Sequence, residues 1–201
     1  MIILYSAPSL SFSFGFHGYI DSILGIYKNI KSNKINSCKF SKKLTFKSSE
    51  MYHPSIKNPI KNDINMNKNI IITGPNAAGK TTTIKATIIN LLLSQQIGFG
   101  FYKKSVTSTF DFIHCYLNIP DSSSRDSLFQ AEARRCKNIL DTIEKNKNKK
   151  HFCIFDELYS GTNPYEAISS AYSYLKYISK NKNVRFLLTT HYIKICNLFD
   201  K

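Results

Sequence analysis

The chain has 201 residues, of which 42% are hydrophobic and 13% aromatic, so it is long enough for one complete α/β domain and too apolar for general disorder. Its 28 Lys and Arg residues outnumber 13 Asp and Glu, and two explanations of the resulting charge of +15 stay open: a nucleic acid or other polyanion as partner, or a nucleotide bias that enriches Lys, Asn and Ile. The five scattered cysteines exclude a zinc module and a disulfide scaffold, and they indicate a soluble intracellular protein of the cytoplasm or nucleus.

The N-terminal quarter differs in composition from the rest. Residues 1–20 contain no Lys, Arg, Asp or Glu. Because Ser, Pro, Gly and His interrupt this run and no basic segment precedes it, a buried or partner-facing segment is favoured over a membrane span or a signal peptide. Residues 28–49 are rich in Lys, Asn and Ser and predict a connector or a solvated surface. We therefore divide the chain near residue 50, into an N-terminal segment of residues 1–50 and a domain of residues 51–201.

A phosphate-binding loop is predicted between Asn69 and Thr83. Residues 69–73 are a short β-branched run, which indicates a buried strand, and apolar residues recur at helical spacing from Thr81 to about residue 96. The intervening sequence fits GxxxxGKT, in which backbone N–H groups and a helix N-terminus surround a phosphate. Lys80 is expected to reach the β- and γ-phosphates, and the Thr81 hydroxyl to hold Mg²⁺. The nucleotide-binding candidates in this loop are Gly74, Pro75, Asn76, Ala77, Ala78, Gly79, Lys80, Thr81 and Thr82.

Further strands and helices alternate after this loop. Strands are predicted at residues 110–119, 151–155 and 184–189, and helices at residues 126–145 and 164–178. This alternation is typical of an α/β fold with a mainly parallel sheet and flanking helices. The basic run 145–150 fits a solvated turn better than a DNA contact.

Acidic and imidazole side chains follow two of these predicted strands. Asp156 ends the apolar strand FCIFD, where a phosphate-binding loop requires a carboxylate to position Mg²⁺. Glu157 comes next and is the candidate to orient the attacking water or accept its proton. His191 ends the last strand and is a candidate to contact the γ-phosphate or that water. The sequence thus predicts a Mg²⁺-dependent hydrolysis of a nucleoside triphosphate.

Three stretches, GPNAAGKTT, DELYSGTNPYEA and LLTTHY, resemble the ATPase domain of MutS-type DNA mismatch repair proteins over residues 53–199. The resemblance implies a P-loop NTPase of the ABC ATPase class that binds ATP and Mg²⁺. It also implies a role for Asn62 near the adenine, since His53-Pro54 and Asn62-Asp63-Ile64 match family positions. SRDSLFQAE matches the family's signature segment, whose serine, here Ser127, reaches the γ-phosphate held by the other subunit of a dimer.

The same resemblance implies a function and partners. We expect an ATP-binding and ATP-hydrolysing module that couples ATP to the clamping of duplex DNA, in a homodimer or a heterodimer with a MutS-like subunit and without a membrane. The family's mismatch reader has no counterpart in these residues, and both a fragment and a reduced relative fit that observation. Two alternatives stay open: another ABC-class DNA-maintenance ATPase, for chromosome maintenance or recombination, and a non-hydrolysing ATP-dependent assembly module.

Overall fold

The computed structural model describes residues 2–117 and 128–199, and the chain forms two compact units, Met1–Asn36 and Ser37–Lys201. The first unit contains one long helix, α1 (Ile2–Lys31). The side chains of Phe12 and Phe14 on this helix are 74% exposed. None of the helices in the described part of the chain is both long and apolar enough to cross a bilayer.

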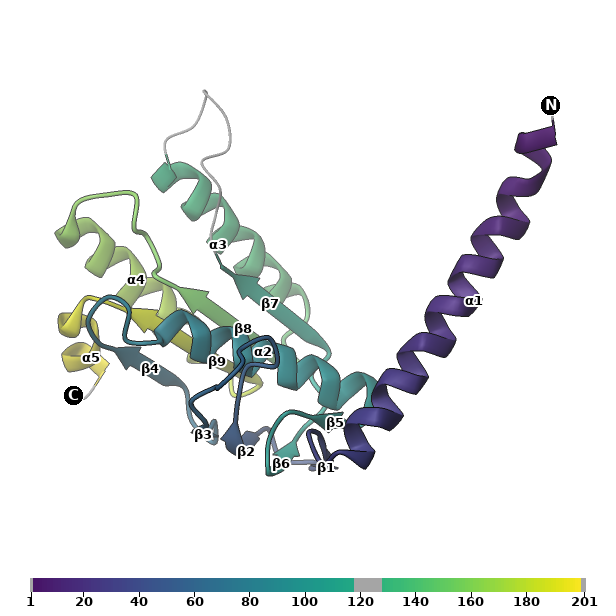
Figure 1. The fold of residues 1–201 in the computed structure, drawn as a ribbon. Helices are drawn as coiled ribbons and strands as arrows, with labels where there is room; N and C mark the ends of the chain where they lie inside the picture. The colour runs from purple at the N-terminus through teal and green to yellow at the C-terminus, as the bar shows by residue number, and fades with distance from the viewer. Residues whose placement is uncertain (1, 118–127, 200–201) are drawn as a thin grey trace. The chain divides into compact units, whose positions relative to one another are not determined.

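The second unit is an α/β structure with two sheets (Figure 1). The first sheet has the strand order β4-β9-β8-β7, and every neighbouring pair is parallel. We call it the parallel sheet. Its strands are β4 (Ile70–Thr73), β9 (Val184–Thr190), β8 (His151–Asp156) and β7 (Phe112–Tyr116).

The second sheet has the strand order β3-β2-β6-β1-β5. Strand β2 is antiparallel to both β3 and β6, whereas β1 and β6 are parallel, and we call it the mixed sheet. Its strands are β1 (Asn36–Phe40), β2 (Phe46–Met51), β3 (Asn62–Asn65), β5 (Phe99–Gly100) and β6 (Lys104–Thr107). The expectation of a single, mainly parallel sheet therefore describes only half of the β-structure.

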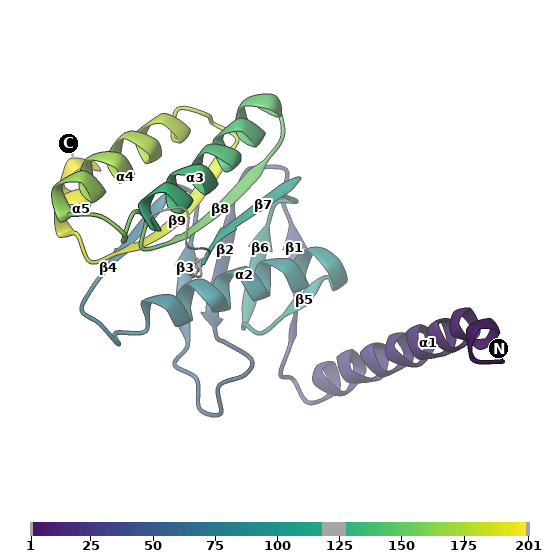
Figure 2. The ribbon, with the colours of Figure 1, turned by 90° about the horizontal axis from the view of Figure 1, so that it is seen from above.

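Helices cover both faces of the parallel sheet. They are α2 (Lys80–Ile97), α3 (Leu128–Lys145), α4 (Pro164–Ile178) and α5 (Ile193–Phe199). Figure 2 shows α3 and α4 on one side of the sheet and α2 on the other. Side chains of β8 alternate between these faces: Cys153 and Phe155 join the core with α3 and α4, while Phe152 and Ile154 join the core with α2 and the mixed sheet. A strand covered on both faces must be apolar throughout, which explains the continuous run at 152–155.

Local signals fix the ends of two helices that border the site. Helix α2 is followed by Gly98, whose φ of 75° is left-handed and whose N–H donates to the Ser94 carbonyl at 3.0 Å. Asn163 caps α4 by accepting the N–H of Glu166 at 3.0 Å, and Pro164 occupies the first turn. These caps explain why both helices lie close to their predicted ranges.

Two predicted segments of this unit differ from the structure in part. Residues 28–49 do not form a solvated connector throughout, because β1 and most of β2 fall within that range. Phe46 and Ser48 point into the unit and are 0% and 2% exposed, while Lys47 between them is exposed. The strand expected at residues 110–119 is present as β7, which begins two residues later, at Phe112, and ends at Tyr116.

Helix α2 is attached to the mixed sheet through a buried amide. Asn90 is 0% exposed, and its Nδ2 donates to the Tyr52 carbonyl at 3.1 Å. Its Oδ1 accepts the N–H of Phe101 at 2.6 Å. Because both amide atoms have partners, the burial of this polar side chain is compensated, and the helix after the phosphate loop is held against the second sheet.

Candidate active site

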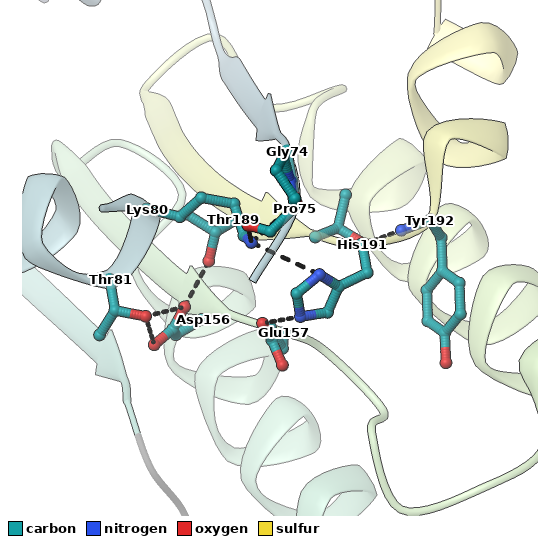
Figure 3. A network of polar contacts seen from close by, with 10 residues as sticks. Gly74, Pro75, Lys80, Thr81, Asp156, Glu157, Thr189, His191 and Tyr192 are labelled. Carbon is teal, nitrogen blue, oxygen red and sulfur yellow. Dashed lines mark hydrogen bonds and ion pairs between the residues drawn. The ribbon is translucent and has the colours of Figure 1, made fainter. Parts of the chain in front are cut away.

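The loop between β4 and α2 folds back onto its own lysine. Lys80 is only 8% exposed, and its Nζ donates to the carbonyls of Gly74 and Pro75, each at 2.8 Å (Figure 3). The loop needs left-handed backbone at Ala77, with φ of 58°, and at Gly79, with φ of 84°. Asn76, just before this pair, and Ala78, between the two residues, are both exposed. A short loop with this backbone in front of a helix N-terminus is the kind of structure that binds phosphate oxygens.

Three oxygen-bearing side chains meet where β8 and β9 end. The Thr81 hydroxyl donates to Asp156, at 3.0 Å from Oδ2 and 3.3 Å from Oδ1. The Thr189 hydroxyl donates to Asp156 Oδ1 from the neighbouring strand, where Asp156 and Thr189 are register partners. A hydroxyl and a carboxylate side by side are hard oxygen ligands, so Thr81 and Asp156 fit Mg²⁺. Thr189 was not predicted as a site residue, although a threonine near the end of an adjacent parallel strand is a usable signal.

Glu157 and His191 lie together at the same edge of the parallel sheet. The Glu157 Oε1 atom contacts His191 Nε2, and His191 Nδ1 lies 3.4 Å from Lys80 Nζ (Figure 3). An ammonium group can only donate, so it selects Nδ1 as the acceptor and leaves the ring proton on Nε2, facing the Glu157 carboxylate. The two strand-end motifs and the loop lysine thus form one chain of polar contacts.

The backbone at Glu157 is unusual for a residue with a side chain. Its φ is 55°, and its N–H donates to the Thr189 carbonyl at 3.0 Å. Left-handed conformations of this kind cost about 1–3 kcal/mol and persist where the surrounding structure enforces them, often at functional sites. Here the conformation turns the chain directly after Asp156, so that two successive carboxylates face different partners.

A cavity of about 350 Å³ lies beside these acidic residues. It is lined by Thr81, Tyr116, Leu128, Glu132, Asp156, Glu157 and Ser160. Tyr116 is 2% exposed, and burial, followed by the negative charge of Glu132, raises the pKa of its hydroxyl, which therefore stays protonated. Neither Tyr116 nor Glu132 was predicted as a site residue. Tyr116 lies in no recognisable motif, and Glu132 ends the segment SRDSLFQAE, in which a role was predicted for Ser127 alone.

A second cavity, of about 300 Å³, lies between residues 52–62, the phosphate loop and the start of α2. It is lined by Tyr52, His53, Ile56, Asn58, Pro59, Ile60, Asn62, Ala78, Gly79, Thr82, Thr83 and Ala86. Asn62 contributes an amide whose Nδ2 donates to the Ile60 carbonyl at 3.4 Å. The structure therefore brings Asn62 and Thr82 to the same cavity, which is separate from the one that Asp156 lines.

One predicted site residue lies outside the described residues. Ser127 falls within residues 118–127, immediately before Leu128, the first residue of α3. The remaining candidates, Lys80, Thr81, Asp156, Glu157 and His191, are brought together as described above.

Similarity to known proteins covers most of this chain. The family description MutS domain V matches residues 70–201. The chain is 31% identical over 179 residues to Endonuclease MutS2 of Streptococcus uberis, which covers 87% of this chain and 22% of the relative. It is 32% identical over 157 residues to DNA mismatch repair protein MutS of Persephonella marina, covering 74% of this chain and 18% of that protein. The chain thus spans about a fifth of the length of these relatives.

Proposed function

The chain belongs to the MutS family through its match to MutS domain V, and on this premise we propose that it binds and hydrolyses ATP as the ATPase module of a MutS-like DNA mismatch repair protein. The fold class proposed is a P-loop NTPase of the ABC class. The observation that carries the proposal is the continuous set of polar contacts from Lys80 through His191 to Glu157, beside the Thr81 and Asp156 pair. The domain is proposed to include β1 and β2, because both strands pair within its mixed sheet and both begin before residue 51.

The residues have separate roles in this proposal. Lys80 binds the β- and γ-phosphates after exchanging the two loop carbonyls for phosphate oxygens. Glu157 orients the attacking water and accepts its proton, and His191 holds the Glu157 carboxylate in place through Nε2. Thr81 and Asp156 would hold Mg²⁺, which when bound neutralises charge on the phosphates. The cavity that contains Asn62 takes the adenine, since it lies next to Gly79 and is lined by apolar and amide groups.

The central test is ATP binding and turnover by the 201-residue chain with Mg²⁺. Lys80→Ala is expected to weaken ATP binding by at least about tenfold, because a charge-assisted contact to phosphate is lost. Lys85→Ala, on the same helix, is the matched control and should bind like the parent. Turnover that is absent from the parent while ATP still binds would contradict hydrolysis and favour an assembly module. Equal binding by parent and Lys80→Ala would contradict the phosphate site.

A second MutS-like subunit is proposed to complete the site through Ser127. Lys80→Ala and Ser127→Ala are then each nearly inactive, whereas their mixture contains one site with an intact Lys80 and an intact Ser127. Mixing the two variants at high protein concentration with ATP should therefore restore turnover. A mixture that stays inactive where the parent is active would show that one chain builds the whole site.

Duplex DNA is the proposed partner of the assembled protein, and the charge of +15 supports an electrostatic contribution from this chain. Binding by the isolated chain should fall steeply as salt rises and should not distinguish a mismatch. Titrations of a homoduplex and a single-mismatch duplex at two salt concentrations measure both properties. A clear preference for the mismatched duplex would contradict this assignment.

A further inference from the structure

Glu132 is a buried acidic residue with no role in the chemistry assigned above. It lies in the second turn of α3 and is 2% exposed. Its Oε1 accepts the Ser160 N–H at 2.9 Å and the Ser160 hydroxyl at 3.0 Å, and its Oε2 accepts the Gly161 N–H at 3.1 Å. Both carboxylate oxygens are thus used by two consecutive residues of one loop.

That loop begins at the proposed general base. Only Leu158 and Tyr159 separate Glu157 from Ser160, and both are buried, at 3% and 7% exposed. Tyr159 also has a left-handed φ of 58°. The backbone from Glu157 to Gly161 is therefore short, has left-handed residues at Glu157 and Tyr159, and is held at its far end by Glu132.

The same loop lies directly against the first turn of α3. A Cβ atom at Gly161 would come within 2.7 Å of Leu128 Cγ and 2.9 Å of the Phe129 backbone nitrogen. Helix α3 is itself fixed to the parallel sheet, since Arg135 donates to the Cys115 carbonyl at 2.6 Å and Cys136 is packed in the core. Glu132 thus connects a helix that is fixed on the sheet to the loop that carries Glu157.

We propose that Glu132 is a positioning residue for ATP hydrolysis, which holds the Glu157–Gly161 loop in the conformation that directs Glu157 at the attacking water. This inference rests on the proposed ATPase function. Glutamine in its place keeps the size of the side chain but has one acceptor oxygen in place of two. Either Ser160 or Gly161 then faces an NH₂ group, and a buried donor loses its partner.

The test compares Glu132→Gln with two variants on the same helix in the 201-residue chain. Glu144→Gln makes the same substitution at a partly exposed residue that pairs with Lys147, and Ile139→Ala removes core packing at a residue outside the loop. We expect Glu132→Gln to lower kcat by about tenfold or more while the Kd for Mg²⁺-ATP changes less than about twofold, because the geometry of the base is altered and the phosphate site is intact. Glu132→Asp, which keeps both acceptor oxygens, should recover part of the rate.

Hydrogen exchange of the Ser160 and Gly161 amides gives a readout that does not depend on turnover. Loss of charge-assisted hydrogen bonds should speed their exchange by about tenfold in Glu132→Gln. In Ile139→Ala, the hydrogen exchange of these two amides should be no faster than that of the amides in α3. If Glu132→Gln does not fold, Ser160→Ala removes one of the three contacts, and a kcat lowered about threefold is expected.

The inference and the proposed function fail in different ways. A parent chain without ATP turnover would contradict the proposed function. An active parent with unchanged kcat in Glu132→Gln, or in Ser160→Ala where that variant is used, would overturn the positioning role alone. A loss of kcat that Ile139→Ala reproduces at equal stability would also overturn it, since Glu132 would then contribute only to folding.

Discussion

The parallel sheet and the mixed sheet contribute different things to the same unit. Strands β8 and β9 are almost wholly buried, and Asp156, Glu157 and His191 lie where these strands end. The strands of the mixed sheet alternate between buried and exposed residues, and Asn62 on β3 reaches only the neighbouring cavity. The residues proposed for catalysis therefore lie on strands that are packed on both faces. The half-exposed mixed sheet contributes Asn62 to the pocket proposed for the adenine.

The largest expected effect concerns the contact between the two sheets. Phe152 on β8 is 0% exposed and packs edge to face against Phe46 of β2, at 6.1 Å, and Phe110, at 5.0 Å between ring centroids. Phe152→Ala should lower the free energy of unfolding by about 3–5 kcal/mol, through lost burial and a cavity. Urea unfolding followed by circular dichroism measures it. Phe40→Ala, at a 54% exposed position of β1, should cost less than about 1 kcal/mol, and equal losses would contradict the role given to Phe152.

A second prediction tests whether chemistry belongs to the parallel sheet. Glu157→Gln should slow ATP hydrolysis by at least about 100-fold, within the range for loss of a general base, while ATP binding is retained. Single-turnover kinetics and an equilibrium binding assay separate the two quantities. Glu144→Gln serves as the control for the charge change. Turnover at the parent rate would mean that another group orients the water.

A third prediction is that the mixed sheet contributes to ATP binding and not to ATP hydrolysis. Asn62→Ala should weaken ATP binding by about fivefold, the effect of one hydrogen bond of about 1 kcal/mol, with kcat unchanged at saturating ATP. Asn65→Ala, at the exposed end of the same strand, should leave the affinity as it is. A fall in kcat with unchanged affinity would reverse the division between the two sheets.

The smallest effect concerns pH and the outer strand of the parallel sheet. Burial, followed by the neighbouring His151, lowers the pKa of His114 to about 4, and the two rings stack with 3.1 Å between Nε2 and Nδ1. The folded state therefore binds this proton less well than the unfolded chain, so stability is complete above about pH 6.5 and falls as pH drops toward 4. We expect a loss of up to about 1 kcal/mol at pH 5, since solvent screens part of the effect at this half-buried ring.

Thermal unfolding between pH 7 and pH 5 measures this pH dependence. His114→Gln should flatten the decline, and His17→Gln, at an exposed position of α1, should not. The same slope in all three proteins would assign the acid sensitivity to other groups.

The two sheets also differ in how far the sequence predicts them. Strands β8 and β9 are continuous apolar runs because both of their faces are covered, and such runs are visible in a single sequence. In β2 only every second residue near its start is buried, and the buried Ser48 and exposed Lys47 look like a solvated segment. The strand is formed by pairing with β3 and β6, which are distant in sequence, so local composition does not reveal it.

The candidate site shows a similar limit. Lys80, Thr81 and Asp156 belong to motifs whose spacing is set by phosphate and Mg²⁺ chemistry, and the structure brings them together. Glu132 lies 25 residues before Glu157 and reaches its loop only because α3 packs beside β7 and β8. A residue of this kind is identified by tertiary packing and not by sequence spacing.

The left-handed backbone at Glu157 has a consequence for protein engineering. Glycine adopts a φ of 55° without a steric penalty, and asparagine does so more readily than glutamate. Variants selected for heat resistance alone are therefore expected to accumulate glycine or asparagine at residue 157 and to lose turnover as they become more robust. A selection that requires both properties should instead leave residue 157 as glutamate and improve the fold at positions away from this edge of the sheet.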